Sequence, residues 1–118
     1  MDKYNIEFYT KQNGEQPARD FMLTLDSKMQ AKIIKNLDML EINGPLTGMP
    51  HSEYLVDGIF EIRAKQSNNI TRILYFFTVG QTIILTNGFV KKTNKTPKRE
   101  IMLAKKYRVD YERRLQDE

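Results

Sequence analysis

The sequence predicts an α+β fold in which an N-terminal strand and a helical hairpin precede a four-stranded antiparallel meander and a C-terminal helix. Apolar residues recur at helical spacing in two stretches of the first half and in one at the end, whereas the second half is rich in β-branched and aromatic residues. The chain has 118 residues, of which 40% are hydrophobic. That number suffices for one core and not for two. We therefore expect a single domain spanning residues 1–118.

The first third of the chain predicts a strand and two helices. Residues 4–9 alternate between apolar and polar side chains, as a strand with one buried face does. Pro17 suits the first turn of a helix, and Asp26 offers an N-cap oxygen for a second helix. This second helix is expected to end near residues 43–45, which read Asn-Gly-Pro. Its apolar stripe consists of Met29, Ile33, Leu37 and Leu40.

Four strands are predicted in the second half. Residues 54–56 and 59–64 flank Asp57-Gly58, a pair that is preferred in two-residue hairpin turns. Residues 70–79 are rich in β-branched and aromatic side chains, and residues 82–86 are almost uniformly apolar. Short turns between these segments predict that each strand runs antiparallel to the one before it.

Charge is divided unevenly along the chain. Residues 63–108 contain eleven Lys and Arg against a single acid, whereas residues 1–60 contain six against nine acids. The densest part is the loop at residues 88–100, which leads into a final helix that Thr96 is expected to cap and Pro97 to open. Such a cluster on a small domain is typical of a protein that binds polyphosphates, most often nucleic acid.

Several classes of protein are excluded by what the sequence lacks. It contains no cysteine and one histidine, which rules out disulfides and cysteine zinc sites and argues against a His-rich metal site, and we expect no metal. It has no Gly-rich phosphate loop, no Gly-x-Ser-x-Gly, no His-Glu-x-x-His and no dinucleotide fingerprint, and we expect no cofactor. The first residues, Met-Asp-Lys-Tyr-Asn, lack the basic start and the apolar core of a secretory signal, and no apolar run approaches the roughly 20 residues of a membrane span. The expected location is the cytoplasm, without a membrane partner.

Two strand arginines are the first candidates for chemistry. Cleaving RNA without a metal requires a base, an acid, and cations that stabilise the charge on the phosphorane. Arg63 and Arg72 lie on neighbouring predicted strands joined by a short turn. In a hairpin they are expected to lie close enough to hold one phosphate between them. The alternative is that both are ordinary solvated arginines on a strand surface.

The basic loop offers further cations. A lysine among other cations can have its pKa lowered enough to transfer protons, so Lys91 is a candidate for catalysis as well as for binding. The alternative is a solvated loop that keeps the protein soluble. The side chains expected to bind RNA are Lys65, Lys92, Lys95, Lys98 and Arg99.

Two more side chains are candidates for the proton chemistry. His51, in a loop before a strand, is the only histidine, the residue type that most readily exchanges protons near neutral pH. No carboxylate partner for it is visible, and an incidental loop histidine is the alternative. Tyr75 belongs to a mainly buried aromatic strand, but a hydroxyl facing a groove would donate a proton or stack on a base. Glu61 shares a strand face with Arg63 and is interpreted as a charge partner rather than as a base.

Three segments, at residues 55–63, 71–77 and 88–97, together with Glu100 and Ala104, resemble the RelE-like toxins, specifically the phage-derived, HigB-type branch of the RelE/ParE superfamily. The segments read Leu-Val-Asp-Gly-Ile-Phe-Glu-Ile-Arg, Thr-Arg-Ile-Leu-Tyr-Phe-Phe and Gly-Phe-Val-Lys-Lys-Thr-Asn-Lys-Thr-Pro. The resemblance implies the RelE-like microbial RNase toxin fold and the toxin of a type II toxin-antitoxin pair. Such a toxin cleaves mRNA in the ribosomal A site by 2′-hydroxyl attack and is neutralised by a helix-turn-helix, HigA-type antitoxin.

The resemblance also implies roles for individual residues. Arg63 and Arg72 resemble the strand arginines that hold the scissile phosphate, and Lys91 and Lys92 resemble the basic loop that binds RNA or ribosomal RNA. The C-terminal tyrosine of RelE-type toxins and the histidine cluster of some HigB toxins have no match, so the base and the acid stay open. Two other functions remain as alternatives: a ParE-type inhibitor that binds gyrase, and a nucleic-acid-binding module without cleavage.

Overall fold

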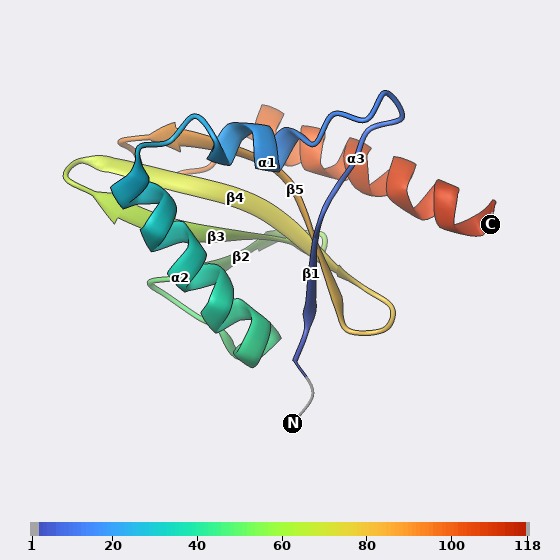
Figure 1. The fold of residues 1–118 in the computed structure, drawn as a ribbon. Helices are drawn as coiled ribbons and strands as arrows, with labels where there is room; N and C mark the ends of the chain where they lie inside the picture. Colours follow the sequence, from blue (N-terminus) through green and yellow to red (C-terminus); the bar gives the residue numbers. More distant parts are fainter. Residues whose placement is uncertain (1–2, 118) are drawn as a thin grey trace.

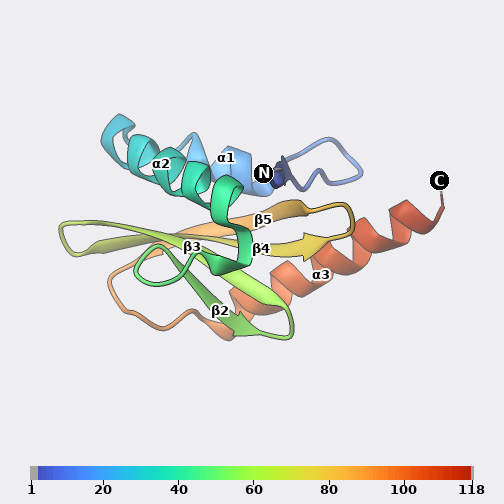
Figure 2. The same ribbon diagram turned by 90° about the horizontal axis from the view of Figure 1, so that it is seen from below.

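The computed structural model describes residues 3–117 and has a five-stranded mixed sheet with helices on both faces (Figures 1 and 2). Helices α1 and α2 cover one face, and α3 crosses the other. The predicted α+β class is confirmed, and the elements follow one another in the predicted order. They are β1 (Asn5–Phe8), α1 (Pro17–Met22), α2 (Ser27–Asn43), the short 3-10 helix η1 (Gly44–Leu46), β2 (Ser52–Val56), β3 (Ile59–Gln66), β4 (Asn69–Thr78), β5 (Thr82–Lys91) and α3 (Lys98–Gln116).

The sheet has the strand order β1-β5-β4-β3-β2. Strands β2 to β5 form the predicted antiparallel meander, and the Asp57-Gly58 turn between β2 and β3 has positive φ at both residues. The structure adds a parallel pairing, because β1 lies beside β5 and extends the sheet. A period-two pattern identifies the buried face of a strand but neither its partner nor its direction, so the sequence did not predict this pairing.

Strand β5 is longer than predicted. It continues from Thr82 through Lys91 across an irregularity in register, so that Leu74 lies opposite Asn87 and Tyr75 opposite Leu85. A Cβ at Gly88 would lie 2.4 Å from the Phe21 ring. This glycine therefore allows α1 to approach the sheet and does not end the strand. The loop between β5 and α3, called the basic loop below, is limited to residues 92–97.

Each face of the sheet is packed against its own helices. The face towards α1 and α2 buries one apolar cluster, and the face towards α3 buries a second, smaller one. Asp26 begins α2 as predicted, because its Oδ1 accepts a hydrogen bond from the Met29 amide at 2.8 Å. Among residues 3–117, no helix combines the length and the apolar character needed to cross a membrane. The first cluster contains Ala18, Met29, Ile33, Leu40, Ile62, Ala64, Ile73, Tyr75, Ile83 and Leu85, and the second contains Tyr9, Ile59, Leu74, Phe76, Ile84 and Ala104.

Candidate nucleic-acid interface

Arg63 and Arg72 lie directly opposite each other on β3 and β4, on the face of the sheet that α3 also covers. The carboxylate of Glu61 lies between the two side chains. Its Oε2 is 3.6 Å from Nε of Arg63 and 3.6 Å from Nε of Arg72. One carboxylate therefore offsets the repulsion between two guanidinium groups that the strand register brings together.

Arg72 is fully buried, with 0% of its surface exposed. Its Nη2 donates a hydrogen bond to the carbonyl of Thr93 in the basic loop, and its guanidinium lies 5.4 Å from the centre of the Phe89 ring. Burial lowers the pKa of Arg72, and the nearby carboxylate of Glu61 opposes this shift. The guanidinium is enclosed by protein, so Arg72 does not face a phosphate site, in contrast to the prediction that it and Arg63 hold one phosphate between them.

Glu61 is also fully buried. Burial raises its pKa, and three neighbours oppose this: a hydrogen bond from the Thr96 hydroxyl, Arg72 and Arg63. The role predicted for Thr96 as the cap of the last helix is wrong, because Pro97 is the N-cap residue and the Thr96 side chain serves Glu61 instead. We call Glu61, Arg72 and Thr96 the buried charge cluster.

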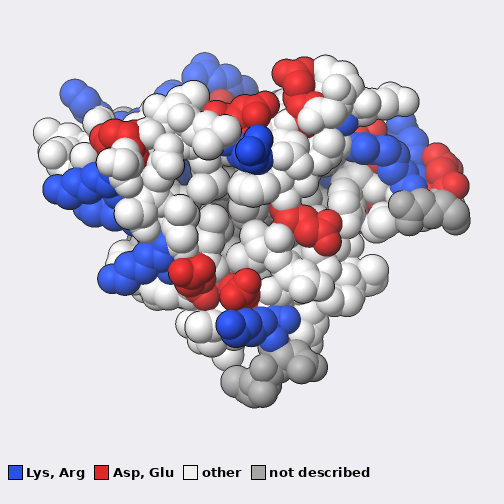
Figure 3. Space-filling model, viewed as in Figure 1, with Lys and Arg blue, Asp and Glu red and all other residues white. Residues whose placement is uncertain are grey.

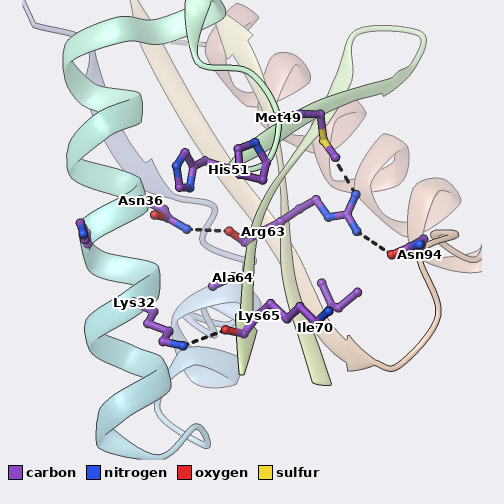
Figure 4. Close-up of a pocket in the computed structure, with 11 residues that line it drawn as sticks. Lys32, Asn36, Met49, His51, Arg63, Ala64, Lys65, Ile70 and Asn94 are labelled. Carbon is purple, nitrogen blue, oxygen red and sulfur yellow. Dashed lines mark hydrogen bonds between the residues drawn. The ribbon is translucent and has the colours of Figure 1, made fainter. Parts of the chain in front are cut away.

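Arg63 is 9% exposed and lies at the border between this cluster and the surface. Its Nη1 donates to Oε2 of Glu53 at 3.0 Å, and its Nη2 donates to Oδ1 of Asn94 in the basic loop at 3.3 Å. In Figure 4 the guanidinium reaches between Met49 and Asn94. Of the two predicted phosphate-binding arginines, Arg63 is the one that opens into a pocket.

The pocket forms where β3 continues past the beginning of β2. Ser52, the first residue of β2, lies opposite Ile62, so β2 leaves the end of β3 uncovered. Side chains of α2 cover this edge: Asn36 donates to the Arg63 carbonyl at 2.6 Å, and Lys32 donates to the Lys65 carbonyl at 2.8 Å (Figure 4). The pocket, called the β3-edge pocket below, measures about 400 Å³. It is lined by Lys32, Lys35, Asn36, Met49, Pro50, His51, Arg63, Ala64, Lys65, Ile70 and Asn94.

The lining of the β3-edge pocket is cationic. It includes three lysines, one arginine and His51, and no carboxylate is among its lining residues. Figure 3 shows several Lys and Arg side chains along the left edge of the molecule, where α2 lies in Figure 1, with an Asp or Glu side chain above them; basic and acidic side chains are both spread over the rest of this face. A pocket with this lining attracts anions, and among biological anions it suits a phosphodiester.

Tyr75 does not face this pocket. It is fully buried, and its hydroxyl shares a hydrogen bond of 2.6 Å with the Ser52 hydroxyl. Burial raises the pKa of Tyr75 to about 12, whereas the bond with Ser52 acts in the opposite direction. The expectation that this hydroxyl faces a groove is corrected, because residues of one strand alternate between two faces and Tyr75 lies on the face packed against α2.

The structure does not bring the other candidate side chains together in one place. His51 and Lys65 line the β3-edge pocket, whereas Lys91 ends β5 opposite Ile70 and therefore lies in a strand rather than in the loop. Lys95 and Lys98 line a separate hollow beside β2. The two remaining candidates are exposed: Lys92 lies in the basic loop, and Arg99 lies in α3, where it pairs with Glu100 at 3.8 Å.

The contribution of α2 to the pocket was not predicted. Lys32 and Lys35 lie in the acidic half of the chain, so the uneven division of charge along the sequence does not point to them. A signal was present, since residues 28, 32 and 35 are lysines at helical spacing and Asn36 interrupts the apolar stripe of the helix. A buried asparagine in such a stripe indicates a hydrogen-bond partner on the neighbouring element.

The fold and the pocket together define a small α+β protein with a cationic pocket at one edge of its sheet. Residues 20–108 match the family described as phage-derived protein Gp49-like (DUF891). Because the match covers more than half of the chain, the protein belongs to this family, which is part of the RelE/ParE-like toxin superfamily and includes toxin-like members of toxin-antitoxin systems. A search of curated proteins found no match.

Proposed function

We propose that this protein is the toxin of a type II toxin-antitoxin pair, of the HigB type, and that it cleaves mRNA on the ribosome. One observation carries the proposal: the guanidinium of Arg63 opens into a pocket that holds three lysines and a histidine and that no carboxylate lines. Membership of the Gp49-like family supports it. The fold is shared with inhibitors that do not cleave RNA, so the pocket and not the fold favours an RNase.

In the proposed reaction, the scissile phosphate of the message lies in the β3-edge pocket. Arg63 binds its non-bridging oxygens, and Lys35 and Lys65 flank it, so that cations stabilise the charge that develops on the phosphorane. His51 takes the proton of the 2′-hydroxyl, and the 2′-oxygen attacks phosphorus. The bond from phosphorus to the 5′-oxygen breaks, and this oxygen takes a proton from solvent. The products are a 2′,3′-cyclic phosphate and a 5′-hydroxyl.

The proposed partners follow from this reaction. The ribosome positions the message, which supplies much of the rate enhancement when the protein offers few acid-base groups. A helix-turn-helix antitoxin neutralises the toxin, and both act in the cytoplasm. Lys91, Lys92 and Arg99 bind RNA or ribosomal RNA outside the pocket.

The experiment is to induce the protein in bacteria and to map the 5′ ends of messages. We expect new 5′ ends inside translated frames, which disappear with Arg63→Lys and decrease with His51→Gln. Arg19→Lys is the matched control, because Arg19 lies exposed on α1, away from the pocket. Growth arrest with intact messages and altered DNA supercoiling would contradict the proposal and favour gyrase as the target.

A further inference from the structure

The guanidinium of Arg63 is surrounded by acceptors that belong to the protein itself. Its Nη1 donates to Oε2 of Glu53 at 3.0 Å, and its Nη2 donates to Oδ1 of Asn94 at 3.3 Å. Its Nε lies 3.6 Å from Oε2 of Glu61, and Sδ of Met49 lies 3.9 Å from Nη1. Each nitrogen of the group that binds phosphate in the proposed reaction therefore has a partner within the chain.

The two carboxylates beside Arg63 differ in their freedom to leave it. Glu61 is fully buried and also lies 3.6 Å from Nε of Arg72, so it has no path to solvent. The side chain of Glu53 is 42% exposed and belongs to the edge strand β2. A change of rotamer moves its carboxylate into water without leaving this carboxylate buried and unpaired. Glu53 is therefore the partner that a ligand can displace.

The balance of charge around the two strand arginines indicates what a displacing ligand must supply. Arg63 and Arg72 carry two positive charges, and Glu61 lies between them with one negative charge. Glu53 supplies the second negative charge. A phosphodiester also carries one negative charge, and its two non-bridging oxygens match the fork of a guanidinium as a carboxylate does. A phosphate that replaces Glu53 therefore keeps both arginines neutralised.

A released Glu53 carboxylate has other cations on its own side of the sheet. Glu53 lies opposite Glu61 in the β2–β3 register, and it lines a hollow of about 490 Å³ together with Lys95 and Lys98. Among residues 3–117, neither of these lysines belongs to an ion pair. The outward position of Glu53 is therefore supported by positive charge as well as by water.

Asn94 is the second displaceable partner of Arg63, and it belongs to the basic loop. The loop is anchored on both sides of it, because the Thr93 carbonyl and the Thr96 hydroxyl are bonded to the buried charge cluster. Asn94 itself is exposed. Rotation of its side chain is thus enough to release the guanidinium, and the loop stays in place.

We propose that Glu53, assisted by Asn94, is an autoinhibitory ligand of Arg63. Its carboxylate occupies the guanidinium until a phosphate of RNA competes for it, and it then turns outward towards the hollow that Lys95 and Lys98 line. The inference rests on the proposed function, because it takes the phosphate of the message as the competitor. It adds that the strength of this internal ion pair sets how tightly RNA binds.

The test is the direction in which RNA affinity changes. The probe is a fluorescent 2′-O-methyl RNA tetranucleotide, which lacks the attacking hydroxyl. Glu53→Gln should bind it about threefold to fivefold more tightly than the parent, which is the range that a half-exposed ion pair contributes. Asn94→Ala should also bind it more tightly, by a smaller factor, because a neutral acceptor competes less than a carboxylate. If Glu53 only holds Arg63 in position, Glu53→Gln binds RNA more weakly.

Two controls separate the ion pair from the change in net charge. Asp38→Asn removes one negative charge from the exposed side of α2, and Asp38 forms no ion pair among residues 3–117. It should bind the probe within about twofold of the parent. In protein that carries Arg63→Ala, Glu53→Gln should increase affinity no more than Asp38→Asn does, because it acts through Arg63. Urea unfolding checks that each variant is folded.

Cleavage kinetics provide a second measurement. A carboxylate that competes only before the message binds raises KM and leaves kcat unchanged. Glu53→Gln should therefore lower KM for ribosome-bound message about as much as it raises affinity for the probe, and keep kcat within about twofold of the parent. A lower kcat would show that Glu53 positions Arg63 for the reaction, and autoinhibition would be overturned.

The binding outcomes separate this inference from the proposed function. If the parent cleaves messages but Glu53→Gln binds the tetranucleotide no more tightly than Asp38→Asn does, autoinhibition is overturned and the proposed function stands. If Glu53→Gln gains affinity through Arg63 but the parent leaves messages intact, the competition is supported and cleavage is overturned. If neither protein binds the tetranucleotide and messages stay intact, both are overturned.

Discussion

Strand β3 contributes to two groups of charged side chains that differ in their access to solvent. The buried charge cluster places Glu61 against Arg72 and Thr96 beneath the basic loop. The β3-edge pocket places Arg63 and Lys65 at an open edge of the same strand, beside the lysines of α2. Glu61 and Arg63 are two residues apart on β3, yet Glu61 is enclosed by protein whereas Arg63, although mostly buried, lines a pocket that opens to solvent.

Because of this difference we expect Arg63 and Arg72, which the sequence does not distinguish, to have different roles. A buried charge is stable only beside a partner of opposite charge, so removing one partner leaves an unpaired buried charge and destabilises the folded state. Arg63 lines a pocket, and a ligand that enters this pocket competes with Glu53 and Asn94 for its guanidinium. We therefore expect changes in the buried charge cluster to act mainly on stability, and changes in the β3-edge pocket to act mainly on RNA binding and cleavage.

The largest effect is expected for Arg72→Met. Glu61 keeps its burial but loses a cation, and breaking a buried pair on one side costs about 3–5 kcal/mol. Urea unfolding followed by circular dichroism measures the change. The exposed Arg19→Met should stay within about 0.5 kcal/mol of the parent. A loss of cleavage in Arg72→Met with unchanged stability would show that this guanidinium contacts RNA after all.

A smaller loss of stability is expected for Thr96→Val. The substitution keeps the shape of the side chain and removes the hydrogen bond to Glu61, so a buried carboxylate oxygen loses its donor at a cost of about 1–3 kcal/mol. The same unfolding measurement applies, with Thr24→Val, on an exposed residue, as the comparison. Equal losses in both variants would mean that the bond to Glu61 contributes nothing specific.

The β3-edge pocket should respond in the opposite way. Replacing Lys35 and Lys65 together by Ala should leave stability within about 0.5 kcal/mol of the parent, because both are exposed. RNA binding should weaken, and the slope of log affinity against log salt should fall by about 1 for each phosphate that the variant no longer binds. Lys28→Ala is the control on the same helix. An unchanged slope in the double variant would show that these two lysines of the pocket do not contact RNA.

A pH series sharpens the account of the buried charge cluster. Because burial raises the pKa of Glu61 above its ordinary 4.5, the folded state binds this proton more tightly than the unfolded chain. The associated stability is fully present below pH 4.5 and is lost as the pH rises through the folded pKa. In Arg72→Met the cation that lowers the pKa of Glu61 is missing, so the folded pKa is higher and more stability is lost between pH 4.5 and neutral pH. The gap in unfolding free energy between the parent and Arg72→Met should therefore shrink from neutral pH towards 4.5, and a constant gap would contradict this.

Local patterns predicted most of the fold. The apolar stripe at residues 29–40 predicted helix α2, and Asp57-Gly58 predicted the turn between β2 and β3. Both predictions were possible because helix periodicity and turn chemistry act over a few residues. The parallel pairing of β1 with β5 and the continuation of β5 through Gly88 depend on contacts between distant segments. Such contacts leave no short-range pattern.

The candidate site was predictable to a smaller extent. The approach of Arg63 to Arg72 follows from a short hairpin, and the structure places them opposite each other. Arg72 is buried because the basic loop folds over it and the Thr93 carbonyl accepts a hydrogen bond from its guanidinium. The charge of the loop residues alone does not indicate this arrangement. Likewise, the lysine spacing on α2 defines a face of that helix but not the strand edge that it covers.

The role proposed for Arg63 is tested most directly by cleavage of ribosome-bound message with purified Arg63→Lys protein. Lysine keeps the positive charge beside Glu53 and Glu61 but loses the planar fork that binds two phosphate oxygens. We expect cleavage to be slowed by about a hundredfold, as when one transition-state donor is removed, and the urea midpoint to be far closer to that of the parent than to that of Arg72→Met. Cleavage at the parental rate would contradict the proposed role of Arg63.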